Sequence, residues 1–352
     1  MTTLKKITSH HLFLPIFALF LLLLFNAFFT PGFFMIKFQN GQLYGRVIDI
    51  LNRSSILIVL SLGMTLVIGT GGIDISQGSV IAISGAICCY LIGGSGSGEA
   101  NVPMFIACIA AIAACAILGA WNGFLVSKLK IQPMVATLIL LTAGRGIAML
   151  ITKGQNITVY YKPFTYIGNT IPGNILPTTI FIATAMIILL VITLKKTSIG
   201  MFVQSVGINS TASHYTGIKV NKIIFMVYVF SGICAGIAGL MESSMIAAAD
   251  PNNAGLNMEL DAILSVALGG TLLSGGKFYL GGSVIGAITI QTMTTTLYAV
   301  GVSSEQLPVY KAIVVIFICL LQSESFKALF SRIPENLKKS KLTEDKKVVM
   351  KV

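Results

Sequence analysis

The chain has 352 residues, of which 55% are hydrophobic and only 10% are charged, and its formal net charge is +12. Soluble domains carry about a quarter charged residues, so this composition excludes an ordinary soluble protein. The positive charge does not predict a nucleic-acid partner, because eight of the 24 Lys and Arg lie in the tail 324–352 and most others flank apolar windows. We therefore expect a polytopic membrane protein that binds no nucleic acid.

Uncharged apolar windows recur along the chain, and several reach the roughly 20 residues that a bilayer-spanning helix needs. The expected fold class is all-α, with about ten transmembrane helices and glycine-rich breaks in some of them. The first window is interpreted as a retained span rather than a removed signal peptide. The predicted spans are 12–30, 50–70, 77–93, 104–125, 133–151, 177–194, 222–242, 259–274, 279–298 and 309–323.

The distribution of basic residues predicts the orientation of these spans, because cytoplasmic loops are enriched in Lys and Arg. With the N-terminus inside, 17 basic residues fall on the cytoplasmic side and six on the outer side, and Arg145 falls within a span. Both termini are therefore predicted to be cytoplasmic. Residues 1–323 form the predicted transmembrane domain, and the basic tail 324–352 is expected to be a disordered cytoplasmic segment.

The longest predicted cytoplasmic loop, 195–222, is long enough to form a docking surface for another protein. Within it, Ser210 to Tyr215 are predicted to form a short helix that ends at Gly217 as a C-terminal cap. The alternative is a plain basic loop held near lipid headgroups.

Asp74 is the one charged residue between residues 54 and 98. An acidic side chain at the centre of a membrane helix costs about 2.5–3.5 kcal/mol, so it normally faces protein or a water-filled cavity. Gly69, Gly71 and Gly72 precede it and predict a break in the helix. Asp74 is interpreted either as a cavity-lining residue or as a helix cap at a cytoplasmic turn, and both roles can hold together.

A second glycine-rich segment, 267–287, predicts another interruption between helices, at Gly269, Gly270, Gly275 and Gly276. Its "GSVIGA" at 282–287 is similar to "GSVIA" at 78–82, which suggests internal repetition. Small residues one helical turn apart, at positions 282 and 286, also favour close packing of two helices.

Neutral polar residues occur within or beside the spans, and such groups suit a polyol better than an ion. The predicted pathway residues are Asp74, Ser76, Ser79, Asn122 and Gln291. Four threonines between residues 292 and 296 add hydroxyl groups, although threonines in membrane helices also bond back to their own helix.

Arg145 is expected near the outer end of its span, with Glu259 and Asp261 as candidate partners.

Enzyme motifs are not matched. A phosphate-binding loop requires G-x-x-x-x-G-K-[ST], but Thr271 stands in its first position and Phe278 in its last. An intramembrane aspartyl protease is a remote alternative, because Asp74 and Asp261 both lie in apolar segments. However, "GGID" does not match the G-x-G-D spacing of those enzymes.

Four blocks occur in the order found in one family of transport proteins. They are "GMTLVIGTGGIDISQGSVIAISGA", "GAWNGFLVSKLKIQPMVATLILLTAGRGIAMLIT", "TSIGMFVQSVGINSTASHYTGIKV" and "LGGTLLSGGKFYLGGSVIGAITIQ". Over residues 50–323 the chain resembles the sugar permeases of the ribose/galactose/xylose class of ABC importers, and most closely the galactofuranose-type permeases.

The resemblance implies a transport subunit that moves a monosaccharide into the cytoplasm across a bacterial cytoplasmic (inner) membrane. The implied partners are an ATP-binding subunit, a second permease subunit (the same or a homologous chain) and an extracytoplasmic sugar-binding protein. ATP and Mg would be bound by the ATPase partner, so neither a cofactor nor a catalytic residue is expected here.

The family's ATPase-coupling segment maps onto residues 207–217. The residues expected to act there are Gly207, Asn209, Ser210, His214 and Gly217. The family pattern has Gly-Asn followed by acidic and Ala residues, whereas this chain has "INST" at 208–211. The chain also departs from the family at Gln77, where a small apolar residue is common.

A stand-alone secondary transporter or channel for a small polar solute is the main alternative. An ion-coupled carrier would need several membrane acids, whereas only Asp74 qualifies clearly.

Overall fold

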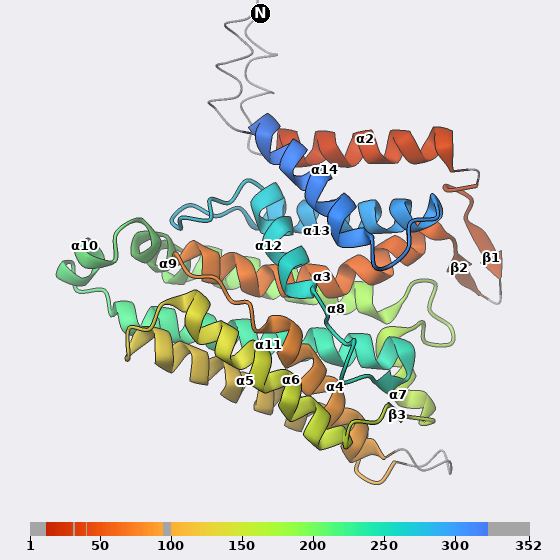
Figure 1. The fold of residues 1–352 in the computed structure, drawn as a ribbon, viewed down its shortest axis with the longest axis horizontal. Helices are drawn as coiled ribbons and strands as arrows, with labels where there is room; N and C mark the ends of the chain where they lie inside the picture. Colours follow the sequence, from red (N-terminus) through yellow and green to blue (C-terminus); the bar gives the residue numbers. More distant parts are fainter. Residues whose placement is uncertain (1–11, 31, 40, 94–99, 323–352) are drawn as a thin grey trace, which may run out of the picture. The chain divides into compact units, whose positions relative to one another are not determined.

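The computed structural model describes residues 12–30, 32–39, 41–93 and 100–322. Helices dominate this part of the chain, and two pairs of short strands lie in the connections between them (Figure 1). The elements are α2 (Phe13–Phe29), β1 (Lys37–Gln39), β2 (Gln42–Tyr44), α3 (Arg46–Gly69), α4 (Gln77–Ile92), α5 (Met104–Ser127), α6 (Pro133–Thr152), β3 (Ile157–Thr158), α7 (Lys162–Gly168), α8 (Thr178–Lys196), α9 (Ile199–Ile208), α10 (Ser210–Tyr215), α11 (Val220–Ile246), β4 (Ala248–Ala249), α12 (Met258–Leu268), α13 (Leu280–Ala299) and α14 (Leu307–Gln322).

Each of the ten predicted spans falls on a helix of the structure. Helix α12, which corresponds to the eighth predicted span, is shorter than predicted, because the chain leaves the helix at Gly269 and takes a positive φ of 86° at Gly270. Within the described residues, five helices are long and apolar enough to cross a membrane: α3, α5, α6, α8 and α11. The helical membrane fold is thereby supported, and ten spans stay a prediction.

Helix α3 lies at the centre of the helical bundle formed by the described part of residues 12–300. Its residues from Ser54 to Gly69 are all buried, as expected for a helix that is apolar on every side. It packs against α11 on one side and against α13 on the other, and α11 also packs against α4 and α5 (Figure 1). Helix α2 packs on α13, where Asn26 Nδ2 donates to Thr296 Oγ1 over 2.6 Å. The central pair α3 and α11 therefore flanks the break before α4.

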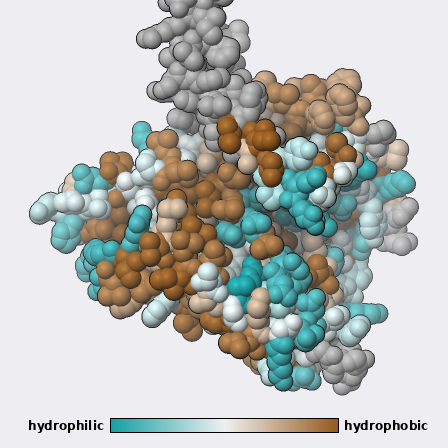
Figure 2. Space-filling view, in the orientation of Figure 1, coloured by the Kyte–Doolittle hydropathy of each residue, from teal (hydrophilic) through white to brown (hydrophobic). Residues whose placement is uncertain are grey.

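Large apolar side chains remain exposed on the outer helices. Phe105 on α5 is 73% exposed and Leu150 on α6 is 79% exposed. Figure 2 shows this brown apolar surface over α5 and α6. Extended apolar surface of this kind marks contact with lipid or with another protein.

Glycines bring α12 and α13 into close contact. A methyl group on Gly282 would overlap the carbonyl oxygen of Gly269, and one on Gly286 would overlap the carbonyl oxygen of Ser265. The predicted close packing through positions 282 and 286 is therefore confirmed.

A short antiparallel ladder joins the connection after α6 to the connection after α11. The predicted orientation places both connections on the outer side. Strands β3 and β4 pair antiparallel, with Ile157 opposite Ala249. The first two strands also pair antiparallel, with Lys37 opposite Tyr44. These strands and the short helix α7 were not predicted, because runs of two or three residues carry no usable periodicity.

The described residues 301–322 belong to a separate unit, which contains helix α14. The predicted last span, 309–323, falls on α14 except for its final residue. The predicted tail 324–352 lies outside the described residues.

Candidate functional site

The chain breaks between α3 and α4 at the glycines singled out above. Helix α3 ends at Gly69, and Gly71 has a φ of +82°, a left-handed conformation that glycine adopts without strain. Gly72 N donates back to the carbonyl oxygen of Val67 over 3.0 Å, which satisfies the end of α3. Residues 70–76 therefore run as non-helical backbone before α4 begins at Gln77.

Asp74 lies at the centre of a buried hydrogen-bonded cluster and is 2% exposed. Its Oδ1 accepts from Ser76 Oγ over 2.6 Å and from Ser76 N over 3.1 Å. Its Oδ2 accepts from Ser231 Oγ of α11 over 2.6 Å. Gln77 Nε2 also donates to Ser231 Oγ over 2.9 Å, and Asn122 Nδ2 of α5 donates to Ser76 Oγ over 2.9 Å. The Asp74 cluster thus joins the break to α4, α5 and α11.

The cluster lies deep along α11. Ser231 is the twelfth residue of this 27-residue helix, so it lies about 16 Å from the start of a helix about 40 Å long. This position is close to the middle of the longest span. The hydrogen bond from Ser76 N places the Asp74 carboxylate against the backbone of the residue that caps α4, as the helix-cap interpretation expects. The cavity-lining interpretation stays a prediction.

Three buried polar atoms around Asp74 have no hydrogen-bond partner within the described part of the chain. They are Gln77 Oε1, Asn122 Oδ1 and Tyr228 Oη. Tyr228 is fully buried, and its hydroxyl group would lie 2.6 Å from a methyl group on Gly72. Buried polar groups are nearly always paired, so such a concentration around one carboxylate is unusual. These atoms are available to bind a polar molecule that enters the break.

The structure brings four of the five predicted pathway residues near one another. Ser79 is the fourth: its Oγ donates to the carbonyl oxygens of Ser76 and of Leu140 on α6, over 2.8 and 3.1 Å. Gln291 lies half-buried on α13, and among the hydrogen bonds of the described residues none links its side chain to the Asp74 cluster. A pathway role for these five side chains stays a prediction.

The threonines of α13 bond back to their own helix, which was the alternative to a pathway role. All four bond back to carbonyl oxygens one turn earlier in the same helix, over 2.7–3.0 Å: Thr292, Thr294, Thr295 and Thr296.

Arg145 binds the connection between α11 and α12 through backbone carbonyl oxygens. Its Nη1 donates to the carbonyl oxygens of Ala254 and Pro251, over 2.6 and 3.2 Å. Glu259, one of its two predicted partners, lies near Arg145, as do Glu242 of α11 and Asp250. The Glu242 carboxylate accepts from the backbone N of the loop at residue 255, over 3.1 Å. Arg145 thus holds the connection between α11 and α12 against α6.

Three glycine-containing segments meet backbone to backbone at the end of α3. Gly276 N donates to the carbonyl oxygen of Gly69 over 3.0 Å. A methyl group on Gly207 would overlap that same oxygen and would lie 2.5 Å from Gly276 N. A methyl group on Gly275 would lie 2.8 Å from the Cα of Gly71. We call these five residues the glycine junction; it joins the first break, the second break and α9.

The predicted coupling segment is a helical hairpin formed by α9 and α10. Gly207 near the end of α9 belongs to the glycine junction, and Asn209 Oδ1 caps α10 by accepting from Ala212 N over 2.9 Å. The predicted short helix 210–215 is confirmed, and Gly217 follows it with a φ of +86°. The hairpin exposes His214 and also Tyr215, which is 84% exposed. The tip of the hairpin is therefore exposed in this chain, while Gly207 at its base contacts both breaks.

Sequence reasoning missed three residues of this site. Ser231 and Tyr228 lie on one face of α11, three residues apart, but a single Ser and Tyr in an apolar span carry no distinct signal. Glu242 had a usable signal, because it is an acidic residue at the end of an otherwise uncharged run, residues 223–241.

Comparison with known proteins places the chain among transport subunits. Residues 46–322 match the family model described as branched-chain amino acid transport system / permease component. No solved structure matches the chain.

Three relatives match over most of their length. The galactofuranose transporter permease protein YtfT of Escherichia coli is 44% identical over 314 residues, which cover 89% of each chain. The fructose import permease protein FruF of Bifidobacterium longum is 39% identical, over 91% of this chain and 89% of that protein. The ribose import permease protein RbsC of Escherichia coli is 33% identical, over 87% of this chain and 92% of that protein.

Proposed function

Because this chain belongs to the permease-component family that its residues 46–322 match, we propose that it is the membrane-spanning permease subunit of an ABC importer and carries a monosaccharide into the cytoplasm. The relatives described above are named for galactofuranose, fructose and ribose, all of which are monosaccharides. Neutral amide and hydroxyl groups around the break suit the hydroxyl groups of such a sugar.

The proposed pathway runs past the break between α3 and α4. Asp74, Ser76, Ser79 and Asn122 supply polar groups at membrane depth, and the unpaired atoms of Gln77 and Tyr228 lie beside them. Broken helices near the midplane are the usual way in which transporters present polar groups to a solute. In this conformation the cluster is closed, so transport requires α3, α4 and α11 to separate around it. Gln291 is proposed to act on the pathway from α13.

The observation that carries the proposal is the glycine junction. It connects the hairpin α9–α10, which is predicted to be cytoplasmic, with both helix breaks through direct backbone contacts. An ATP-binding subunit that moves the hairpin would therefore move the end of α3 and the segment before α13 together. We infer that residues 207–217 dock in a groove of that subunit, with Ser210, His214 and the exposed Tyr215 at the contact.

The remaining partners and the location follow from the same proposal. A second permease subunit, the same or a homologous chain, completes the passage, and an extracytoplasmic binding protein delivers the sugar. The protein would lie in a bacterial cytoplasmic membrane with both termini inside. ATP and Mg would be bound by the ATPase subunit and not by this chain.

Reconstitution tests this function. The chain is purified with its associated ATP-binding subunit, placed in liposomes, and given labelled ribose, fructose or galactose together with the extracytoplasmic binding protein. ATP-dependent accumulation of one sugar is expected. Accumulation of sugar by the chain alone, without ATP, would instead show a secondary transporter or channel.

A further inference from the structure

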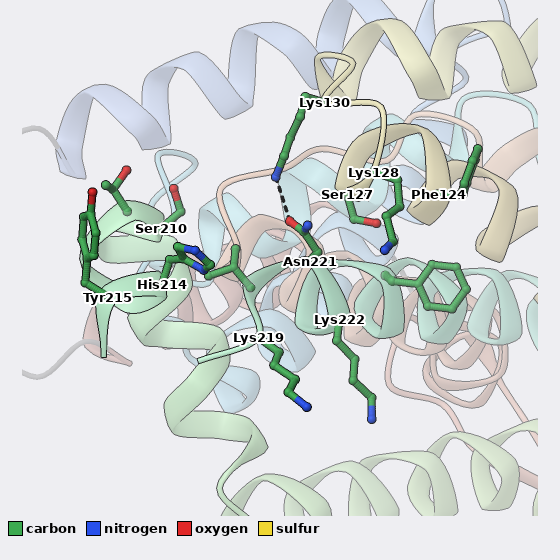
Figure 3. A pocket seen from close by; sticks show the side chains of 13 residues that line it. Phe124, Ser127, Lys128, Lys130, Ser210, His214, Tyr215, Lys219, Asn221 and Lys222 are labelled. Atoms are coloured by element: carbon green, nitrogen blue, oxygen red, sulfur yellow. Dashed lines mark hydrogen bonds between the residues drawn. The ribbon is translucent and has the colours of Figure 1, made fainter. Parts of the chain in front are cut away.

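A basic cavity lies beside the coupling hairpin (Figure 3). It encloses about 880 Å³, and its walls come from the end of α5, the connection to α6, α10 and the start of α11. The lining contains no acidic residue among those described, and it contains four lysines: Lys128, Lys130, Lys219 and Lys222. The cavity therefore concentrates positive charge on the side of the bundle that the charge distribution predicts to be cytoplasmic.

Groups that bind an anion lie on opposite walls of this cavity. Lys130 Nζ donates to Asn221 Oδ1 over 2.7 Å and so joins the α5–α6 connection to α11. In Figure 3, Lys219 and Lys222 extend from α11 on the side away from Lys130, so the lysines of the cavity lie on both sides of the start of α11. The hydroxyl group of Ser210 and the imidazole of His214 belong to the wall formed by α10. The four lysine ammonium groups suit a phosphate, which has oxygen acceptors on all sides, while Ser210 and His214 are left to the proposed contact with the ATP-binding subunit.

Apolar surface borders the charged part of the cavity. Phe124 lines it and is 43% exposed, and Leu129 beside it in the chain is 56% exposed. Trp121, the single tryptophan of the chain, lies one turn before Phe124 and is 52% exposed. Tryptophan is enriched where a membrane protein crosses the headgroup level. In Figure 2 hydrophilic residues over α10 border this apolar surface. The expected occupant is therefore an anion that carries an apolar chain.

We propose that this cavity binds the phosphate headgroup of an anionic phospholipid from the cytoplasmic leaflet. Basic pockets between membrane helices on the cytoplasmic side bind such headgroups, because their charges are complementary and little water separates them. The acyl chains would lie along Trp121 and Phe124. A lipid held there contacts α10 and α11 together and so fixes the coupling hairpin relative to the longest span. The inference rests on the predicted orientation and not on the identity of the transported solute.

Native mass spectrometry of the purified full-length chain tests the proposal. The chain is mixed with phosphatidylglycerol and phosphatidylcholine that have the same acyl chains and equal concentrations. The pocket variant carries Lys128→Gln, Lys130→Gln, Lys219→Gln and Lys222→Gln. The control variant removes four charges elsewhere, through Lys153→Gln, Lys162→Gln, Lys195→Gln and Lys196→Gln. The wild type and the control are expected to retain phosphatidylglycerol preferentially, and the pocket variant to lose this preference by about tenfold or more.

Several results would overturn the proposal. Equal retention of the two lipids by the wild-type chain is one, and unchanged preference in the pocket variant is another. Displacement of bound phosphatidylglycerol by excess inorganic phosphate would identify a site for a soluble anion. In a second spectrum the ATP-binding subunit is added; its loss from the pocket variant, with unchanged lipid preference, would identify an acidic protein surface as the occupant. If the fourfold variant does not fold, the pair Lys219→Gln and Lys222→Gln is compared in the same way. The experiment does not measure sugar uptake, so the lipid preference can be interpreted even if the proposed transport function is wrong.

Discussion

Gly207→Ala is expected to uncouple ATP hydrolysis from transport. The added methyl group would overlap the carbonyl oxygen of Gly69 and lie 2.5 Å from Gly276 N, whereas ordinary van der Waals contact begins at 3.4 Å. The nitrogen must therefore move by 0.9 Å and the oxygen by more. Overpacking of this kind costs about 1–3 kcal/mol, and loss of the hydrogen bond between Gly276 and Gly69 costs about 1 kcal/mol more. The packed junction would then be disfavoured by about tenfold at least.

The assay is ATP-dependent sugar uptake by the reconstituted importer, measured together with ATP hydrolysis. Uptake is expected to fall by about tenfold or more, while the ATP-binding subunit still associates and hydrolyses ATP. Gly146→Ala is the matched control, because Gly146 is also helical and its methyl group would meet no atom within 4 Å. Normal uptake by the Gly207→Ala importer, at normal amounts of protein, would refute the role given to the glycine junction.

Three further predictions concern the break and the helices around it. Asp74→Ala removes the acceptor of three donors, the hydroxyl groups of Ser76 and Ser231 and the backbone N–H of Ser76, at a cost of about 1–3 kcal/mol each, and should abolish uptake while assembly and ATP binding persist; unchanged uptake would remove Asp74 from the mechanism. Tyr228→Phe removes a buried hydroxyl group that has no described partner, so thermal stability should stay equal or rise while uptake falls, and a loss of stability would contradict this assignment. Gly286→Ala would press a methyl group into the Ser265 carbonyl oxygen and should destabilise the fold by about 1–3 kcal/mol, seen as a lower melting temperature than for Gly281→Ala, where the space is open.

Much of the helical fold was predictable from the sequence, because uncharged apolar windows mark helices directly. The predicted span 259–274 was too long, because the apolar run continues through "LGGTLLSGG"; the interruption predicted at Gly269 and Gly270 is where α12 ends, and Gly270, Gly275 and Gly276 all have positive φ. Composition reports how apolar a segment is and says less about where its backbone turns.

The candidate site was predictable only in part. A carboxylate in an apolar run costs enough free energy to be noticed, so Asp74 and its glycines stood out. The partners of Asp74 did not, because Ser231 and Tyr228 are ordinary residues whose role depends on packing of α11 against the break. The glycine junction was also hidden, since three segments far apart in sequence must fold before their backbones meet. Gln291 was predicted to lie with Asp74 because it is a polar residue in an apolar span. It lies instead on α13, which packs against α2, α3 and α12.

Thiol accessibility at the break tests the central claim most directly. Ser76→Cys is introduced into a chain whose six native cysteines have been replaced, and the importer is treated with a membrane-impermeant thiol reagent. Ser76 is 1% exposed in this structure, so we expect protection at rest and rapid labelling when ATP and the sugar-loaded binding protein are both present. Equal protection in the resting and transporting states would show that no sugar passes this break.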